Sequence, residues 1–104
     1  MVQFILVNDF KALNHDNSCQ IVDVREEREY LSVRIPRSIL VPLSQFENKL
    51  NLVDKDKPIY FLCGIGKRAQ KAAEFLESNG WTNLFVIEGG LKAWIEAGYP
   101  VECG

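Results

Sequence analysis

The sequence has few residues that could hold a metal ion or cross-link the chain. It contains one histidine, His15, and three cysteines, Cys19, Cys63 and Cys103, with no Cys-x-x-Cys pair. An odd number of widely spaced cysteines does not fit a disulfide framework. A zinc site needs a closely arranged set of nitrogen and sulfur ligands, which is lacking. We therefore expect neither a metal nor an organic cofactor.

Long hydrophobic runs and a strong net charge are also lacking. The apolar stretch 1–7 is short, no lysine or arginine precedes it, and Asn8 and Asp9 interrupt it. We interpret it as a strand and not as a signal peptide or membrane anchor. The net charge is only −2, which argues against a nucleic-acid or anionic-membrane surface. We expect no nucleic-acid partner, no membrane partner and a cytoplasmic location.

What the sequence does contain is a regular alternation of strand-like and helix-like segments. Its 104 residues suit one domain, residues 1–104. Short apolar runs predict strands at 4–7, 20–24, 38–41, 58–62 and 84–87. Helices are expected at 9–14, 25–31, 44–52, 91–97, and between a loop at 63–68 and a stop at 79–80. The polar stretch 15–18 is expected to form a turn. This order predicts an α/β domain with a mostly parallel sheet.

One helix start carries a specific signal. The tetrapeptide from Ser44 to Glu47 has the Ser-x-x-Glu form of a capping box, in which each side chain accepts a free backbone N–H of the first turn. We therefore expect the helix at 44–52 to begin there.

In parallel sheets, ligands bind at the carboxyl ends of the strands. That rule selects the positions after Val24, Leu62 and Ile87. The run 58–62 is continuously apolar, which predicts a central strand buried on both faces. The loop that follows it combines a cysteine, two glycines and two cations, in the order Cys63, Gly64, Ile65, Gly66, Lys67 and Arg68.

The residue types of this loop favour the thiolate form of Cys63. Two glycines let the backbone turn tightly, so that N–H groups point at one atom and form an anion-binding nest. The following helix adds its positive N-terminal end, and Lys67 and Arg68 add full charges. From these residues alone, a stabilised nucleophilic cysteine and a buried structural cysteine beside a glycine-rich turn are both open.

Four motifs, in order along almost the whole chain, resemble the landmarks of the rhodanese family. Residues 21–30 contain Asp-Val-Arg followed by an acidic run and Glu-Tyr. Ile-Pro at 35–36 and Val-Pro-Leu at 41–43 are similar to the next landmark. Residues 63–68 match the Cys-x-x-Gly-x-Arg active loop. Residues 88–94 match the closing Glu-Gly-Gly-x-x-x-Trp signature.

The resemblance implies a five-stranded, mostly parallel sheet flanked by helices. It also implies transfer of a sulfane sulfur from a donor such as thiosulfate to cyanide or a thiol, with Cys63 as the catalytic nucleophile that carries the sulfur as a persulfide. Asp23 and Arg25 are implied to support the active site from the neighbouring strand end. The residues implied to cradle the persulfide and the donor anion are the rest of the loop: Gly64, Ile65, Gly66, Lys67 and Arg68.

Three alternatives stay open. The fold could serve as a protein-binding module without turnover, or as a sulfur-relay carrier that hands sulfur to a specific protein or tRNA-modifying enzyme. A phosphatase or arsenate-reductase activity is less favoured. Phosphatases that resemble rhodaneses have five residues between the cysteine and the arginine, whereas four separate Cys63 from Arg68.

The sequence also departs from the family pattern at 33–38, where many relatives have Gly-His-Ile-Pro-Gly-Ala. Val33 is β-branched and resists a positive φ, so we expect a rebuilt turn before Ile35. Arg34 and Arg37 either border the pocket as anion contacts or, as the simpler interpretation, are solvated.

Position 64 is a second departure, because many relatives have arginine where this chain has Gly64. The loss of that cation leaves Lys67 and Arg68 as the expected main anion contacts.

The remaining candidates have simpler structural interpretations. The acidic stretch 26–29 is expected to be a solvated helix face, and Trp94 to pack in the core. Cys19 is expected to be buried, and Cys103 to lie in a mobile tail. The glycine pair 89–90 is expected to serve a tight turn into the last helix.

Overall fold

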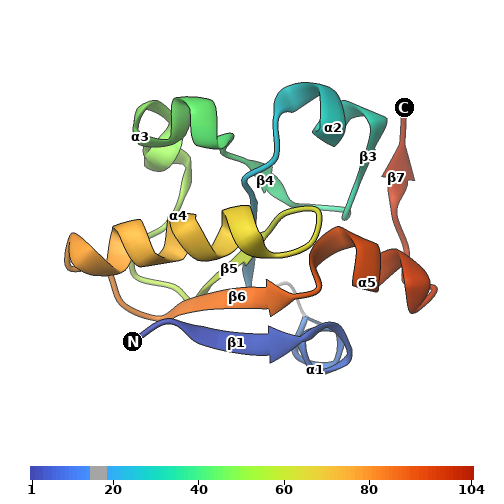
Figure 1. Cartoon of the computed structure of the whole chain (residues 1–104), viewed down its shortest axis with the longest axis horizontal. Helices are drawn as coiled ribbons and strands as arrows, with labels where there is room; N and C mark the ends of the chain where they lie inside the picture. Colours follow the sequence, from blue (N-terminus) through green and yellow to red (C-terminus); the bar gives the residue numbers. More distant parts are fainter. Residues whose placement is uncertain (15–18) are drawn as a thin grey trace.

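The computed structural model describes residues 1–14 and 19–104, so the turn expected at 15–18 lies outside the described residues. Five strands form one parallel sheet in the order β1-β6-β5-β2-β4 (Figure 1). This confirms the predicted α/β fold and its five-stranded parallel sheet. The strands are β1 (Gln3–Leu6), β2 (Gln20–Asp23), β4 (Ile39–Leu40), β5 (Ile59–Leu62) and β6 (Leu84–Glu88).

Strand β5 lies in the middle of the sheet and is buried at every position, as its apolar run predicted. Successive side chains of a strand point to opposite faces. Ile59 and Phe61 accordingly pack in one hydrophobic cluster, and Tyr60 and Leu62 in another. By the same alternation, Cys63 falls on the face of Ile59 and Phe61. The alternation of side chains along β5 therefore determines on which face of the sheet Cys63 packs.

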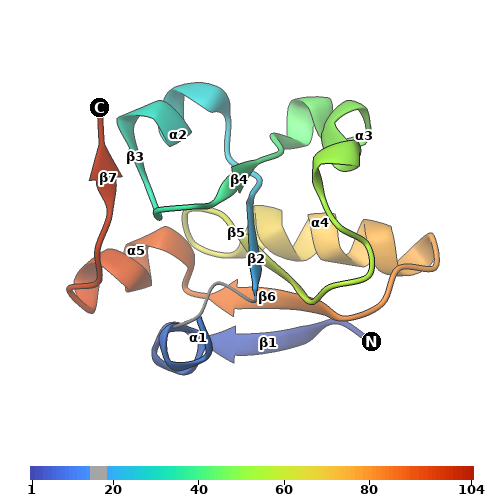
Figure 2. The ribbon, with the colours of Figure 1, turned by 180° about the vertical axis from the view of Figure 1, so that it is seen from behind.

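Helices cover both faces of the sheet (Figures 1 and 2). The cluster that contains Cys63 includes buried residues of α3 and α4, whereas the opposite cluster includes Phe10 of α1 and Trp94 of α5. Trp94 is thus a core residue, as expected. Among the described residues, no helix is long and apolar enough to span a bilayer. The helices are α1 (Val7–Leu13), α2 (Glu27–Ser32), α3 (Phe46–Lys49), α4 (Lys67–Ser78) and α5 (Gly90–Glu96).

A two-stranded antiparallel sheet joins β3 (Val33–Arg34) to β7 (Glu102–Cys103), and Figure 2 shows these strands side by side next to α2. The sequence did not predict this sheet. Cys103, expected in a mobile tail, instead lies exposed in β7 opposite Val33. Val33 has an extended φ of −155°, which confirms that it avoids a positive φ. The left-handed conformation falls on Arg37, with φ 69°.

The helix predicted at 44–52 is present, but its α-helical part is shorter and starts at Phe46. The chain forms a 3₁₀ turn at Leu43–Gln45, the short helix α3, and a second 3₁₀ turn at Leu50–Leu52. The Ser44 hydroxyl donates to Oε1 of Glu26 at 2.6 Å instead of capping its own helix. A capping box does form at the start of α2, where it joins Glu26 to Glu29. A tertiary acceptor has replaced the local one that the pattern predicted.

Candidate active site

Cys63 is the first residue after β5 and is only 1% exposed. Its Sγ accepts two backbone hydrogen bonds, from the N–H of Gly66 at 2.9 Å and from the N–H of Ala69 at 3.3 Å. Backbone donors that converge on one atom stabilise negative charge there. The structure therefore contains the amide nest that the loop composition predicted.

The loop reaches this geometry through one left-handed glycine. Gly66 has φ 109° and is the N-cap of α4, which begins at Lys67. The first N–H groups of a helix lack intrahelical partners and carry partial positive charge. The Ala69 N–H is one of these groups, so part of the positive end of the α4 dipole points at Sγ. Gly64 does not have a positive φ, so only the second glycine supplies the predicted left-handed turn.

The glycine pair at the start of α5, Gly89 and Gly90, does more than make a turn. A Cβ atom on Gly90 would lie 2.3 Å from the carbonyl oxygen of Cys63 and 2.7 Å from that of Gly64. The N–H groups of Leu91 and Lys92 donate to these same two oxygens at 2.8 and 3.1 Å. The start of α5 therefore fixes the backbone of the Cys63 loop. The sequence analysis did not predict this contact between α5 and the Cys63 loop. The glycine pair at 89–90 was the feature that could have indicated it.

Asp23 and Arg25 form a buried ion pair at the end of β2. Arg25 Nε lies 3.0 and 3.1 Å from the two carboxylate oxygens of Asp23, and Nη2 lies 2.7 Å from Oδ2. The guanidinium also donates to the carbonyl of Val33 at 2.7 Å. Because Asp23 is in register with Leu62, this pair lies at the strand end next to Cys63. It connects β2 to β3 beside the loop.

Arg68 forms a second ion pair, with Glu29 of α2. Its Nη1 and Nη2 donate to Oε1 and Oε2 of Glu29 at 2.8 and 3.1 Å. This hydrogen-bonded pair lowers the pKa of Glu29 to about 2, and the bond to the Glu26 N–H adds to the effect. The same bond to Glu29 raises the pKa of Arg68. Both groups are therefore charged at neutral pH.

The Glu29–Arg68 pair corrects one expectation and changes another. Residues 26–29 are not simply a solvated helix face, because Glu29 binds Arg68 and Glu26 binds Ser44. The guanidinium of Arg68 is engaged by a carboxylate and is not a free anion contact. Lys67 is exposed, and the described residues give it no ion-pair partner.

The two arginines of the 33–38 segment have other partners. Arg34 Nε lies 3.4 Å from Oε1 of Glu102, and Nη1 donates to the carbonyl of Tyr30 at 3.3 Å. Arg34 therefore connects α2 to β7 and is not merely solvated. Arg37 lines a cavity of about 200 Å³ together with Lys11 and Trp94, and the Cys63 loop does not line that cavity.

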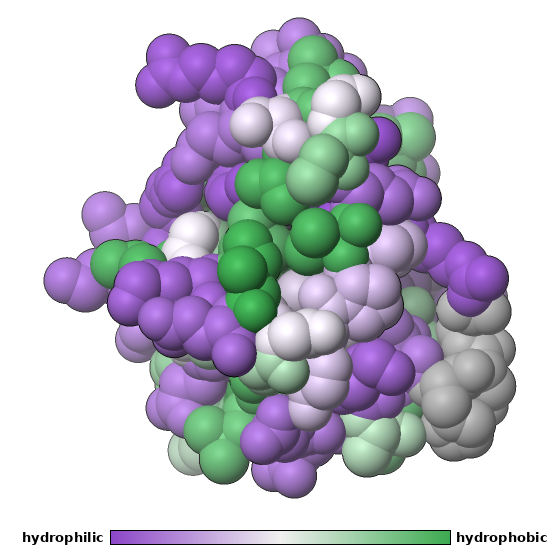
Figure 3. All heavy atoms as spheres, turned by 90° about the vertical axis from the view of Figure 1, so that its right-hand side faces the viewer, coloured by the Kyte–Doolittle hydropathy of each residue, from purple (hydrophilic) through white to green (hydrophobic). Residues whose placement is uncertain are grey.

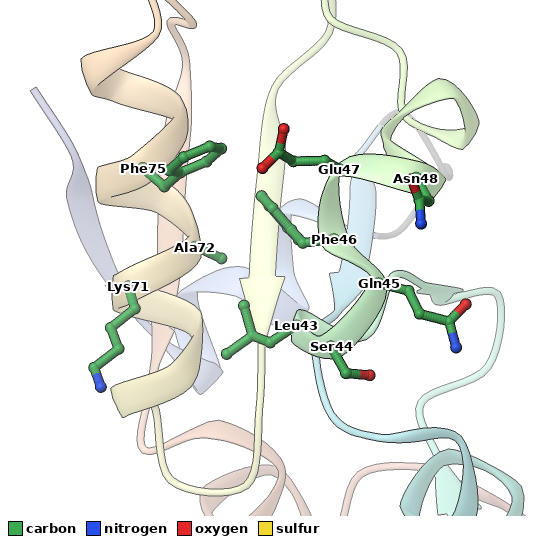
Figure 4. A pocket seen from close by; sticks show the side chains of 9 residues that line it. All are labelled: Leu43, Ser44, Gln45, Phe46, Glu47, Asn48, Lys71, Ala72 and Phe75. Atoms are coloured by element: carbon green, nitrogen blue, oxygen red, sulfur yellow. The ribbon is translucent and has the colours of Figure 1, made fainter.

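A larger groove, of about 590 Å³, lies between α3 and α4. Figure 4 shows Phe46 on one wall pointing toward Ala72 and Phe75 on the other. Cys63 is not among its lining residues, so the amide nest is separate from this groove. Among the described residues, no group of three or more His, Cys, Asp and Glu side chains is placed to hold a metal ion.

Comparison with known proteins supports what this geometry indicates. Residues 6–97 match the family model described as "Rhodanese-like domain". The chain belongs to the rhodanese-like domain family.

Particular relatives extend this result. YqhL of Bacillus subtilis is 37% identical over 75 residues, which cover 72% of this chain and 60% of that protein. The chain therefore spans less than two thirds of YqhL. The thiosulfate:glutathione sulfurtransferase of Saccharomyces cerevisiae is 31% identical over 112 residues, covering 93% of this chain and 81% of the relative. A rhodanese-related protein from Thermoplasma volcanium has a crystal structure with a TM-score of 0.86 and 34% identity, covering 96% of this chain and 97% of that one. Sulfurtransferases thus occur among the relatives.

Proposed function

We propose that the chain is a sulfurtransferase that carries a sulfane sulfur on Cys63 as a persulfide. The observation that carries this proposal is the convergence of the Gly66 and Ala69 N–H groups on Sγ. The name of the yeast relative, a thiosulfate:glutathione sulfurtransferase, supports thiosulfate as a donor and a thiol as an acceptor. Cyanide is a second thiophilic acceptor for the same step.

In the first half-reaction, the Cys63 thiolate attacks the sulfane sulfur of thiosulfate. A bond forms between Sγ and that sulfur, the S–S bond of thiosulfate breaks, and sulfite leaves with its electron pair. The product is an anionic Cys63 persulfide. The loop amides stabilise the negative charge on the thiolate without reorganising, because the start of α5 already fixes the loop backbone.

In the second half-reaction, an acceptor thiolate attacks the outer sulfur of the persulfide. A new S–S bond forms, the bond between the two sulfurs of the persulfide breaks, and Cys63 leaves as a thiolate. The amides of Gly66 and Ala69 make Cys63 a good leaving group because they stabilise that thiolate. A nucleophilic residue speeds the reaction because it divides one difficult transfer into two easier covalent steps.

The other site residues support this cycle in different ways. We assign Gly64, Ile65 and Gly66 to the backbone wall around the sulfur, and Lys67 to attraction of the anionic donor. Arg68 would act through its pair with Glu29, as developed below. The buried Asp23–Arg25 pair would brace the neighbouring strand end.

Intact-protein mass spectrometry after incubation with thiosulfate tests the proposal. We expect the wild type to gain the mass of one sulfur atom, and to lose it on addition of cyanide or glutathione. Cys63→Ser should gain none. Cys103→Ser is the matched control, because Cys103 is exposed and lies in β7. A wild type without the added sulfur, or a Cys63→Ser variant that gains it equally, would refute the mechanism.

A protein acceptor is the second candidate. Figure 3 shows a band of hydrophobic atoms between hydrophilic ones on the side of the molecule that carries β7 and α5, and such exposed bands are typical of contact surfaces. Ile65, at 60% exposure, adds an apolar side chain to the loop itself. A sulfur-relay role predicts slow transfer from thiosulfate and fast transfer from a protein persulfide. Equal rates from both donors would argue against it.

The proposed setting of the reaction follows from its chemistry. A thiol that alternates with a persulfide needs a reducing environment to stay available. In the part of the chain that the structure describes, which includes all three cysteines, no disulfide is formed. We therefore propose a cytoplasmic location, and residues 1–104 as a single functional domain.

A further inference from the structure

We propose that Glu29 sets the charge preference of the site. By pairing with Arg68 it keeps the rim of the Cys63 loop less positive, so that the preference of the site for dianionic over monoanionic donors is smaller than it would be without Glu29. This inference rests on the proposed function for its donors. Its central measurement is anion binding, which requires no sulfur transfer.

The pair is held from both sides. Two donors of the Arg68 guanidinium meet the two oxygens of Glu29 at 2.8 and 3.1 Å. Oε1 of Glu29 also accepts the backbone N–H of Glu26 at 3.0 Å as part of the α2 capping box. A carboxylate fixed by its own helix cannot follow a departing guanidinium. A donor anion must therefore compete with Glu29 for Arg68.

Arg68 is close enough to the sulfur site for this competition to matter. A Cβ atom on Gly64 would lie 3.5 Å from Nη2 of Arg68, so the guanidinium lies against the loop residue directly after Cys63. The Cys63 charge is also among the causes that raise the pKa of Arg68. The negative charge of Glu29 cancels the positive charge of Arg68. Lys67 then supplies the net positive charge of the loop.

Charge arithmetic gives the expected effect. Glu29→Gln removes one negative charge from the rim, which makes it more positive by one unit. A unit charge about 7 Å from the anion in a solvent-like dielectric changes affinity about threefold for each charge on the anion. A dianion should therefore bind about sevenfold more tightly to Glu29→Gln, and a monoanion about threefold.

Sulfate and methanesulfonate provide a matched pair of unreactive anions that differ in charge. The loop N–H resonances of Gly64 and Gly66, followed by NMR in each titration, give their dissociation constants. We expect Glu29→Gln to improve sulfate binding more than methanesulfonate binding by about threefold. Glu27→Gln is the matched control, because Glu27 is exposed on the same helix, whereas Arg68 pairs with Glu29. It should leave the ratio of the two constants unchanged.

Arg68→Gln provides an independent test with the opposite sign. It leaves Glu29 in place and makes the rim more negative, so sulfate binding should weaken by about sevenfold and methanesulfonate binding by about threefold. This result does not depend on whether Glu29→Gln folds. An unchanged sulfate-to-methanesulfonate ratio in a folded Glu29→Gln, or in Arg68→Gln, would overturn the inference.

Steady-state kinetics connects the binding result to sulfur transfer. In Glu29→Gln, the KM for thiosulfate should fall more than the KM for methanethiosulfonate, with kcat little changed. If the anion ratio shifts as expected but no variant forms a persulfide, the charge inference stands and the proposed function fails. If persulfide forms but the ratio does not shift, the function stands and the inference fails.

Discussion

Two ion pairs flank Cys63, and they differ mainly in burial. The side chains of Arg25 and Asp23 are 4% and 0% exposed, whereas those of Arg68 and Glu29 are 38% and 32% exposed. Both pairs use a guanidinium that meets both oxygens of a carboxylate. The same chemistry therefore occurs in two solvent environments beside one cysteine.

Because the two ion pairs differ in burial, they have different roles. Removing one partner of a buried pair leaves an uncompensated charge, which costs about 3–5 kcal/mol. A pair open to solvent contributes about 0–1 kcal/mol. The Asp23–Arg25 pair is accordingly a structural element of the strand end. The Glu29–Arg68 pair can open to a ligand at small cost, which suits a residue that tunes donor binding.

The largest expected effect comes from breaking the buried pair. Asp23→Asn leaves Arg25 charged and buried, so we expect the free energy of unfolding to fall by about 3–5 kcal/mol. Urea unfolding followed by circular dichroism measures this loss. The variant should still gain sulfur at Cys63 when it is folded. A loss below about 1 kcal/mol, the range of solvent-exposed pairs, would remove the distinction between the two pairs.

A smaller effect is expected from the exposed pair at neutral pH. Glu29→Gln should lower the free energy of unfolding by about 1 kcal/mol, the upper range for solvent-screened pairs. Glu27→Gln, on the same helix, is the control and should change stability by less. If Glu29→Gln is as destabilising as Asp23→Asn, Glu29 is a structural residue and its proposed tuning role loses its basis.

The pH dependence of this difference has a definite sign. The pKa of Glu29 is lowered from 4.5 to about 2, so in this range the unfolded chain binds more protons at this group than the folded one. The stabilisation is fully present above about pH 5 and is lost as the pH falls toward 2. The stability gap between wild type and Glu29→Gln should therefore narrow over that window. A gap that is as wide at pH 2 as at neutral pH would exclude the ionised pair as its cause.

The comparison also shows how far the sequence could go. Strand ends and loop composition indicated Cys63 and its loop through local pattern, whereas Asp23 and Arg25 were expected only through the resemblance to the rhodanese family. The Glu29–Arg68 pair joins residues 39 positions apart, and nothing in the acidic run around Glu29 indicates its partner.

Other misses have the same origin in tertiary contacts. Ser44 has a local capping pattern, but Glu26 lies 18 residues away and offers its hydroxyl an acceptor at 2.6 Å. Gly90 was interpreted as a turn residue. In the structure, a glycine is required at this position because the carbonyl oxygen of Cys63 occupies the space that a Cβ atom would fill. Strands β3 and β7 have two residues each, too few to show a period of two.

Salt should produce the smallest effect and separates the pairs by screening alone. The Debye length falls from about 10 Å at 0.1 M salt to about 3 Å at 1 M. The stability gap between wild type and Glu29→Gln should therefore shrink by a few tenths of a kcal/mol over that range. The gap for Asp23→Asn should stay constant, because the buried pair excludes ions. Each gap compares two proteins in the same buffer, so general salt effects on folding cancel. If both gaps shrank equally, solvent would reach Asp23 as readily as Glu29.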